Sequence, residues 1–589
     1  MSRKSRSLDF LFAMLLLLAL LLLLAVRAPY RLEFKEQIGI FMLGADRMEW
    51  YLSNPAVISS IAGDWLTQFY SNGRVGAVLS FLLFIAILAG LAEFFRRAEP
   101  RRPLCLILLM LPVLLEYYFI PFPNYPVSAT VGLVLSIWTA CALARIKDSE
   151  YSCLIYGLSI PVMFVLAGGH ALTLALLLGF MQRKKGAVPV ISLVAGLALM
   201  MICGRFYNLT FMQTLIWPVC PGYIIPATAL LILQPFLVLL TVAVSLTYYR
   251  FMENRWKAVM LSTFSALLIP LSDTVSDRNL ESVVKIGTLA YHNEWDEVKR
   301  MASSTRYKDR NMYSDYYWNL CNARQGKLAE GLLQGGWGRS SDILFLSTGQ
   351  GDPYFSMIYY TDALLEMGNV SDATDCALLA QTVMPGHYST RMLRRLAEIA
   401  VVTADYDVAR KYLNILMRTR NHRKWAAELL DCIEADNIPE QYLKWRAGTL
   451  DNDRFYAQGD IKGALSIIAS ESPYNKTAID YLLCSYLLDK NINSFRNLYD
   501  RYYLDGLDRM VTVPELYEQA LLTSVDSRES LMETIGKYHI SQKTVDSYMN
   551  LLEARAKSAN PQTSITTEAM GTYWHYIMAV RFNTSEDRR

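Results

Sequence analysis

The pattern of hydrophobic and polar positions divides the chain into two unlike halves. Up to about residue 270, long apolar runs alternate with short polar connections, whereas the remainder mixes charged and aromatic residues with regularly spaced apolar ones. Runs of about 20 apolar residues have the length that crosses a bilayer as a helix. The sequence therefore predicts an all-α protein: a polytopic transmembrane helix bundle over residues 1–272, then an external α-solenoid over residues 273–589.

About nine apolar runs make up the predicted bundle. The first follows the basic start MSRKSR and also suits a signal peptide, but its length and the spans after it favour an uncleaved membrane helix. The two runs around Gly168-Gly169-His170 are short, so they form either a tight hairpin or a broken, partly re-entrant segment. The runs after the first are Val75–Phe95, Leu104–Ile120, Val127–Ala144, Cys153–Ala167, Ala171–Met181, Ala187–Cys203, Ile224–Tyr248 and Ala258–Leu271.

Basic residues predict the orientation of the bundle, because Lys and Arg in short loops stay on the cytoplasmic side. One alternating set of loops carries nearly all of them, and the opposite short loops contain only Arg205. The N-terminus is therefore expected in the cytoplasm of a bacterium, with the bundle in the inner membrane and the C-terminal domain in the periplasm. The basic groups are Arg3/Lys4/Arg6, Arg96/Arg97/Arg101/Arg102, Arg145/Lys147, Arg183/Lys184/Lys185 and Arg250/Arg255/Lys257.

The loop over residues 27–74 combines amphipathic segments with the densest carboxylates of the first half. The segments EQIGIFMLGADRMEWYL and PAVISSIAGDWLTQFY predict two short helices with a break near Ser53-Asn54-Pro55. On the predicted topology they lie along the outer membrane surface and roof a cavity. The carboxylates are Glu33, Glu36, Asp46, Glu49 and Asp64.

The second half shows a repeated turn. Five positions each end a predicted helix, with an apolar residue two positions later and a mostly small residue five positions later: Asn293, Gly326, Gly368, Ala404 and Gly459. The spacing scatters around the roughly 34 residues of tetratricopeptide helix pairs, which these degenerate repeats resemble. An irregular helical domain with chance matches is the alternative. A solenoid commonly holds a partner protein, and tyrosines such as Tyr316 and Tyr359 line either a groove or the core between helices.

Composition adds few constraints. The net charge of +3 gives no concentrated basic face and so no indication of nucleic-acid binding. The nine cysteines form no CxxC pair and no Cys/His cluster at metal spacing, so no metal site is indicated. Buried free thiols are favoured over a disulfide. No phosphate-binding loop, dinucleotide-binding pattern, nucleophile elbow or HExxH motif is present, and no cofactor is identified.

Candidate chemistry is confined to polar residues at the predicted outer face. If the bundle closes, Asp46, Glu116, His170 and Arg205 ring one outer cavity, where an acid beside an Arg and a His binds phosphate or metal and acts as a general base. Separate solvation of each residue at the membrane interface is the alternative interpretation.

Two resemblances follow from these segments. A first span, an acidic outer loop with two amphipathic helices, many spans and an external domain resemble the C-type glycosyltransferases, which use lipid-linked sugars. That resemblance implies a loop carboxylate as base or metal contact, with Asp46 in GADRMEW the best match and Glu36 in KEQIG the second. The segments EQIGIFML, YLSNPAVISSIAGDWLTQFY and GGH also resemble a family of uncharacterised polytopic membrane proteins from Gram-negative gut anaerobes.

Two functions of different classes remain open. The first is an envelope scaffold or assembly factor, in which the repeats recruit a periplasmic protein and the bundle anchors it among membrane lipids. The second is a glycosyltransferase-like enzyme, in which Glu116, His170 and Arg205 bind a lipid-linked sugar and Asp46 deprotonates the acceptor. A transporter ranks third, because the spans contain few ionisable residues and no evident repeated halves.

Overall fold

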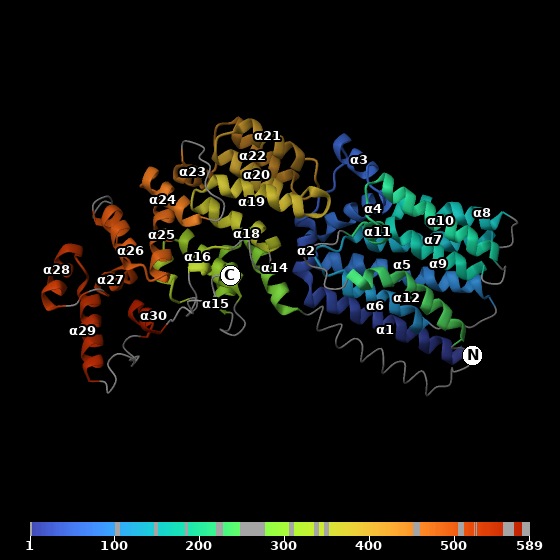
Figure 1. Cartoon of the computed structure of the whole chain (residues 1–589), viewed down its shortest axis with the longest axis horizontal. Coiled ribbons are helices and arrows are strands. Elements are labelled where there is room, and N and C mark those ends of the chain that lie inside the picture. Colours follow the sequence, from blue (N-terminus) through green and yellow to red (C-terminus); the bar gives the residue numbers. More distant parts are fainter. Residues whose placement is uncertain are drawn as a thin grey trace. The chain divides into compact units, whose positions relative to one another are not determined.

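The computed structural model describes most of the chain, and each described secondary-structure element is a helix (Figure 1). Contacts divide the chain into two compact units. We call Met1–Lys285 with Thr382–Leu393 and Asn414–Ala427 the membrane unit, and Ile286–Gln381 with Arg394–Leu413 and Glu428–Arg589 the helical-pair unit. The described residues are 3–100, 106–146, 151–182, 187–219, 228–247, 277–304, 311–334, 341–346, 353–450, 460–504, 512–523, 525, 527–557 and 570–579.

The predicted boundary at residues 272 and 273 lies outside the described residues and stays a prediction. The membrane unit nevertheless includes two stretches from the second half of the sequence, Thr382–Leu393 and Asn414–Ala427. Two segments of the predicted solenoid therefore belong to the membrane unit. A single domain boundary in the sequence does not predict this arrangement.

Apolar helices form the body of the membrane unit. Four segments are long and apolar enough to cross a membrane: Asp9–Arg27, Gly73–Ala98, Val127–Ile146 and Ser152–Gln182. Eight of the nine predicted runs coincide with helices, and the ninth, Ala258–Leu271, lies outside the described residues. The helices are α1 (Arg3–Arg27), α2 (Pro29–Gln37), α3 (Ala45–Leu52), α4 (Val57–Thr67), η1 (Gln68–Ser71), α5 (Gly73–Ala98), α6 (Leu106–Phe119), α7 (Val127–Leu143), η2 (Ala144–Ile146), α8 (Ser152–Ala167), η3 (Gly168–His170), α9 (Ala171–Gln182), α10 (Ala187–Phe206), α11 (Phe211–Ile216) and α12 (Thr228–Thr247).

Helix α5 packs against α1, α6 and α7, while α12 packs against α6 and α9 (Figure 1). The buried face of α5 carries Phe84, Ile87 and Leu91, and its opposite face exposes Val78 and Leu82. A helix that is apolar on all sides suits a lipid surrounding, because lipid tails accept apolar side chains as readily as a protein core does.

The Gly-Gly break separates α8 from α9, and these two helices pack against each other. The backbone amide of Gly169 donates a 2.8 Å hydrogen bond to the Trp217 carbonyl oxygen. A Cβ atom on Gly169 would lie 2.1 Å from the Leu215 carbonyl oxygen, and one on Gly168 would lie 2.4 Å from that of Trp217. The two glycines are therefore required because the backbone at the end of α11 and at Trp217 packs directly on them.

The helical-pair unit is built from shorter helices, and five helices have residues in both units: α14, α19, α20, α21 and α22. The helices are α14 (Arg278–Tyr291), α15 (Trp295–Ser304), α16 (Met312–Arg324), α17 (Leu328–Gly331), η6 (Ser341–Ile343), α18 (Pro353–Glu366), α19 (Val370–Val383), η7 (Pro385–His387), α20 (Thr390–Val402), α21 (Tyr406–Leu416), α22 (Arg423–Glu434), α23 (Glu440–Gly448), α24 (Ile461–Glu471), α25 (Lys476–Leu488), α26 (Ile492–Tyr499), η8 (Asp500–Leu504), α27 (Glu515–Leu522), α28 (Arg528–Tyr538), α29 (Gln542–Ala556) and α30 (Tyr573–Ala579).

Four of the five predicted turn positions follow a helix and adopt the left-handed conformation that commonly ends helices. Their φ angles are 61° at Asn293, 67° at Gly326, 77° at Gly368 and 60° at Ala404. The fifth, Gly459, lies outside the described residues. The predicted helix ends are confirmed at these four positions. Left-handed residues also follow α22, α25 and α28, at Asp436, Lys490 and His539, where the sequence predicted no such turn.

The tyrosines proposed for a groove are buried instead. Tyr313, Tyr316, Tyr317 and Tyr359 are at most 5 % exposed. Tyr316 donates a 2.7 Å hydrogen bond to the Tyr359 carbonyl oxygen, which ties α16 to α18. These rings therefore form the core between helices, which was the alternative to a groove. The side chain of Tyr354 is not among those that the structure describes.

The cysteines in the described part of the chain are free thiols, as predicted. Cys321, Cys376 and Cys484 are buried, and Cys432 is half-buried. Burial raises the pKa of the Cys376 thiol to about 12, which keeps it protonated and unreactive.

The turn at Gly368 can be tested against the turn at Gly326, since both have a positive φ angle. A Cβ atom on Gly368 would lie 2.1 Å from the Gly448 carbonyl oxygen, whereas one on Gly326 meets nothing within 4 Å. We expect Gly326→Ala to cost about 1–2 kcal/mol from the left-handed backbone alone. Gly368→Ala should cost clearly more, because it adds a backbone clash. Thermal melting of the purified protein measures both, and equal losses would contradict the packing at Gly448.

Candidate functional site

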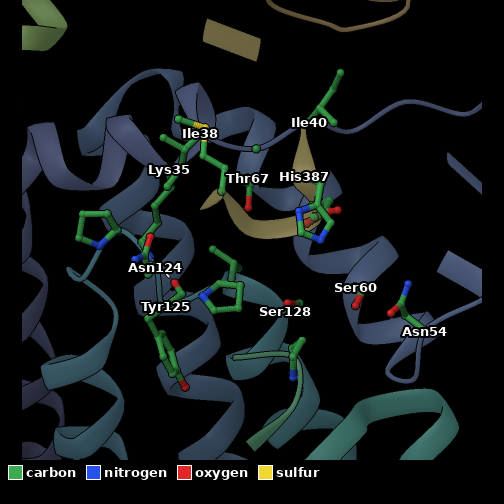
Figure 2. A pocket seen from close by; sticks show the side chains of 18 of the residues that line it. Lys35, Ile38, Ile40, Asn54, Ser60, Thr67, Asn124, Tyr125, Ser128 and His387 are labelled. Atoms are coloured by element: carbon green, nitrogen blue, oxygen red, sulfur yellow. Dashed lines mark hydrogen bonds between the residues drawn. The ribbon is translucent and has the colours of Figure 1, made fainter. Parts of the chain in front are cut away.

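A cavity of about 420 Å³ lies in the membrane unit and is lined in part by residues of α2, α3 and α4 (Figure 2). Its walls come from four parts of the chain: residues 35–67, residues 123–128 at the start of α7 and just before it, Trp217 with Pro218, and residues 382–387. Both polar and apolar side chains line it. The volume falls in the range of small-ligand sites, roughly 300–1,000 Å³.

The loop over residues 27–74 folds as three helices rather than two. Helices α2 and α3 are separated by the non-helical residues 38–44, and Ala56 interrupts the chain before α4 with a φ angle of 67°. The predicted break near Ser53-Asn54-Pro55 is confirmed. The additional break allows the side chains of α2 and α3 to face the same cavity.

Arg47 on α3 is the most extensively bonded residue of the cavity wall. Its Nη2 atom donates to Asp64 Oδ2 at 2.9 Å and to the Ile40 carbonyl oxygen at 3.4 Å, while Nη1 donates to the Gly386 carbonyl oxygen at 3.3 Å. The guanidinium is 3 % exposed. Three aromatic rings surround it, with centroid distances of 4.1 Å to Trp50, 4.9 Å to Tyr51 and 5.9 Å to Tyr388.

Asp64 on α4 is the carboxylate that lines this cavity. Its Oδ2 atom also accepts a 2.7 Å hydrogen bond from the Tyr51 hydroxyl. Burial raises the pKa of Asp64, and the Arg47 charge opposes that shift. The preceding Gly63 sets its position, because a Cβ atom there would lie 2.4 Å from the Ser128 backbone. Helix α4 therefore sits directly on the start of α7.

Lys35 on α2 is a buried amine in the cavity wall. Its Nζ atom donates to the Phe122 carbonyl oxygen at 2.7 Å and to the Tyr125 carbonyl oxygen. Burial and the nearby Arg31 lower the pKa of Lys35 to about 7, although the Glu116 carboxylate acts in the opposite direction. Figure 2 shows Lys35 extending toward Asn124 and Tyr125.

Glu116, predicted to bind substrate, is fully buried on α6. Its carboxylate accepts hydrogen bonds from the Tyr125 hydroxyl at 3.0 Å, from Thr130 at 2.6 Å and from the Gln234 amide. His170 borders a small space of about 10 Å³ together with Tyr125 and Gln234. The structure therefore brings Glu116 and His170 close to the same two side chains, next to the main cavity.

Glu36, the second candidate for a catalytic carboxylate, joins two distant stretches of the membrane unit. Its Oε1 atom lies 3.0 Å from both Asn421 Nδ2 and His422 Nε2. The adjacent Gln37 binds Arg391 at 3.0 Å through its side-chain oxygen. Glu36 borders a neighbouring space of about 20 Å³ but not the main cavity.

Asp46 and Arg205 are both exposed, and neither lines the main cavity. Asp46 lies in the first turn of α3, next to Arg47, and Arg205 lies in the last turn of α10. The catalytic roles of Asp46 and Glu36 stay predictions. Within the described residues, no group of three His, Cys, Asp or Glu side chains is placed to hold a metal ion.

Four cavity residues were not predicted as such from the sequence: Lys35, Arg47, Asp64 and His387. A weak signal existed for Asp64, because Gly63-Asp64 interrupts the otherwise apolar pattern of VISSIAGDWL. No local pattern points to His387, whose Nδ1 atom lies 3.0 Å from the Thr382 carbonyl oxygen.

Comparison with protein families gives a match over residues 4–579, nearly the whole chain. The chain belongs to DUF6057, a family of unknown function. Membership confirms the predicted relation to an uncharacterised family. Neither the curated proteins nor the solved structures give a significant match.

The pairing of Arg47 with Asp64 can be measured by a double-mutant cycle. We expect a coupling energy of about 1–3 kcal/mol, because Arg47→Met leaves a largely buried carboxylate without its cation, whereas adding Asp64→Asn removes that charge. Arg410 and Asp407 provide the control, since their 2.9 Å pair is 44 % and 96 % exposed and should show almost no coupling. Thermal melting of the single and double variants supplies the energies. Equal coupling in both pairs would contradict the role of Arg47.

Proposed function

We propose that this membrane protein is an enzyme that transfers a sugar from a lipid-phosphate donor held in the cavity of the membrane unit. The observation that carries the proposal is one cavity that combines the Lys35 amine, the Arg47–Asp64 pair and apolar walls. The charge distribution in the loops supports a periplasmic active site on a multi-pass inner-membrane protein. The resemblance of the architecture to C-type glycosyltransferases supports the same class.

The lining suits a donor that is part lipid and part polar. Ile38, Ile40 and Val127 offer apolar surface near the helix bundle, whereas Asn54 and Ser60 offer hydrogen-bonding groups. Cations on such a wall stabilise the negative charge of a phosphate, both in the bound donor and in the departing lipid phosphate. The cavity therefore has the chemistry that a sugar attached to a lipid phosphate requires.

Asp64 is the base that the geometry favours. Its Oδ2 atom is held by Arg47 and Tyr51, while no described residue donates a hydrogen bond to Oδ1. In the proposed reaction, Oδ1 takes the proton from an acceptor hydroxyl as that oxygen bonds to the anomeric carbon of the sugar. The bond from this carbon to the phosphate oxygen breaks, and the lipid phosphate leaves with the electron pair.

A scaffold role is the second candidate, and the repeated left-handed turns between helices favour it. Degenerate tetratricopeptide-like pairs would hold a periplasmic partner protein, and the cavity would bind a membrane lipid without chemistry. The two candidates differ in one respect that can be measured: only the enzyme needs the cavity carboxylate for turnover.

Exchange of the carboxylates tests the enzyme directly. We expect a strain carrying Asp64→Asn to accumulate the same lipid-linked sugar as a deletion strain, because loss of a general base slows a reaction by about 10²–10⁴-fold. The matched variant Asp46→Asn should leave the lipids unchanged, since Asp46 is exposed and does not line the cavity. Mass spectrometry of lipid extracts measures the donor, and immunoblots of membranes confirm equal amounts of protein.

Three other outcomes would contradict the role of Asp64 or the enzyme itself. Accumulation with Asp46→Asn but not with Asp64→Asn would make Asp46 the base, as the sequence resemblance implies. A deletion strain whose lipid-linked sugars match the wild type would exclude the enzyme. A deletion phenotype that Asp64→Asn fully complements would support the scaffold.

A further inference from the structure

The cavity has two chemically different ends. Figure 2 shows Lys35, Asn124 and Tyr125 at one side of the view and Asn54 and Ser60 at the other. We call the first the lysine end. Its residues come from α2 and from the connection between α6 and α7.

The two cations of the cavity wall are not equivalent. Arg47 is neutralised by Asp64 at 2.9 Å, and its terminal nitrogens already donate to backbone oxygens. In the described part of the chain, no ion pair neutralises Lys35. An anion entering the cavity therefore gains most from Lys35.

The hydrogen bonds of Lys35 depend on its protonation state. A neutral amine has two N–H groups, and the carbonyl oxygens of Phe122 and Tyr125 accept two. A third N–H group exists only in the ammonium form. A phosphate oxygen at the lysine end would accept this third hydrogen bond, so the bound phosphate selects the charged form.

Charged neighbours of Lys35 come from three helices. Arg31, one turn away on α2, disfavours the ammonium form, although its own charge is paired with Glu281 of α14 at 3.0 Å. Glu116 on α6 favours it, but its oxygens are bonded to Tyr125, to Thr130 and to Gln234 of α12. Tyr125 lies between them, with its carbonyl oxygen on Lys35 and its hydroxyl on Glu116.

We propose that the lysine end is the phosphate subsite of the cavity and that phosphate binding there is coupled to the uptake of one proton by Lys35. The proposal rests on the proposed function, because it assigns the phosphate of that donor to one end of the cavity. The sugar then extends toward Arg47 and Asp64.

The direction of the pH dependence follows from this coupling. Burial lowers the pKa of Lys35 to about 7, and a bound phosphate raises this pKa by stabilising the charged form. Below pH 7 the amine is already charged and the affinity is constant. Above pH 7 each binding event must first protonate the amine, so the affinity falls by up to about tenfold per pH unit.

The test measures binding of a polyprenyl phosphodiester that carries a neutral sugar. The free polyprenol, which lacks the phosphate, is the uncharged control ligand. The phosphodiester has a fixed charge from about pH 6 to pH 9, so any pH dependence belongs to the protein. Titration calorimetry in detergent, in buffers of different ionisation enthalpy, counts the protons taken up. We expect one proton per phosphodiester at pH 8 and none at pH 6.

Two variants locate the effect. Lys35→Met should bind the phosphodiester weakly and equally at all pH values, at about the affinity of the wild type at pH 9. Lys285→Met, which changes a lysine of the same unit near Tyr30 rather than in the cavity wall, should keep the pH dependence. Binding to the wild type without proton uptake, or an unchanged pH dependence in Lys35→Met, would overturn the subsite and leave the proposed function standing. Absence of any phosphodiester binding to the wild type would overturn both.

Discussion

The contact on which the cavity depends most is the burial of the Arg47 guanidinium. A cation that is 3 % exposed is stable only if hydrogen bonds and an opposite charge replace its water. Asp64 supplies the charge, the backbone at Ile40 and Gly386 supplies acceptors, and aromatic rings cover the faces. Because these partners come from α4, from the link between α2 and α3 and from the segment after α19, one side chain fixes three walls of the cavity.

The same principle extends to the neighbouring polar groups. Glu36 and Gln37 reach Asn421, His422 and Arg391 and so hold distant stretches of the chain within the membrane unit. Lys35 donates to the carbonyl oxygens of Phe122 and Tyr125, beyond the end of α6. These contacts leave the Lys35 amine and Oδ1 of Asp64, together with lining side chains such as Asn54 and Ser60, as groups that a ligand in the cavity can meet.

Local patterns predicted the elements better than the site. Apolar runs located the bundle helices, and the turn spacing located Gly326 and Gly368, because helix length and left-handed turns leave local sequence signals. The carboxylates of the loop were also recognised, but nothing in the sequence distinguishes Asp46 from Asp64. Only the packing of α4 against α7 at Gly63 places Asp64 at the cavity. His387 lies more than 300 residues from Lys35 in the chain, and only the fold brings both to one cavity. Contacts between residues so far apart in the chain leave no periodic pattern in a single sequence.

The most direct measurement is the structure of the protein in a lipid nanodisc with a polyprenyl phosphodiester sugar bound. We expect the phosphate within about 3 Å of Lys35 Nζ, with the sugar between Arg47 and Asp64 and the lipid chain against the helix bundle. A phosphate bound elsewhere on the membrane unit, with the cavity empty, would contradict it.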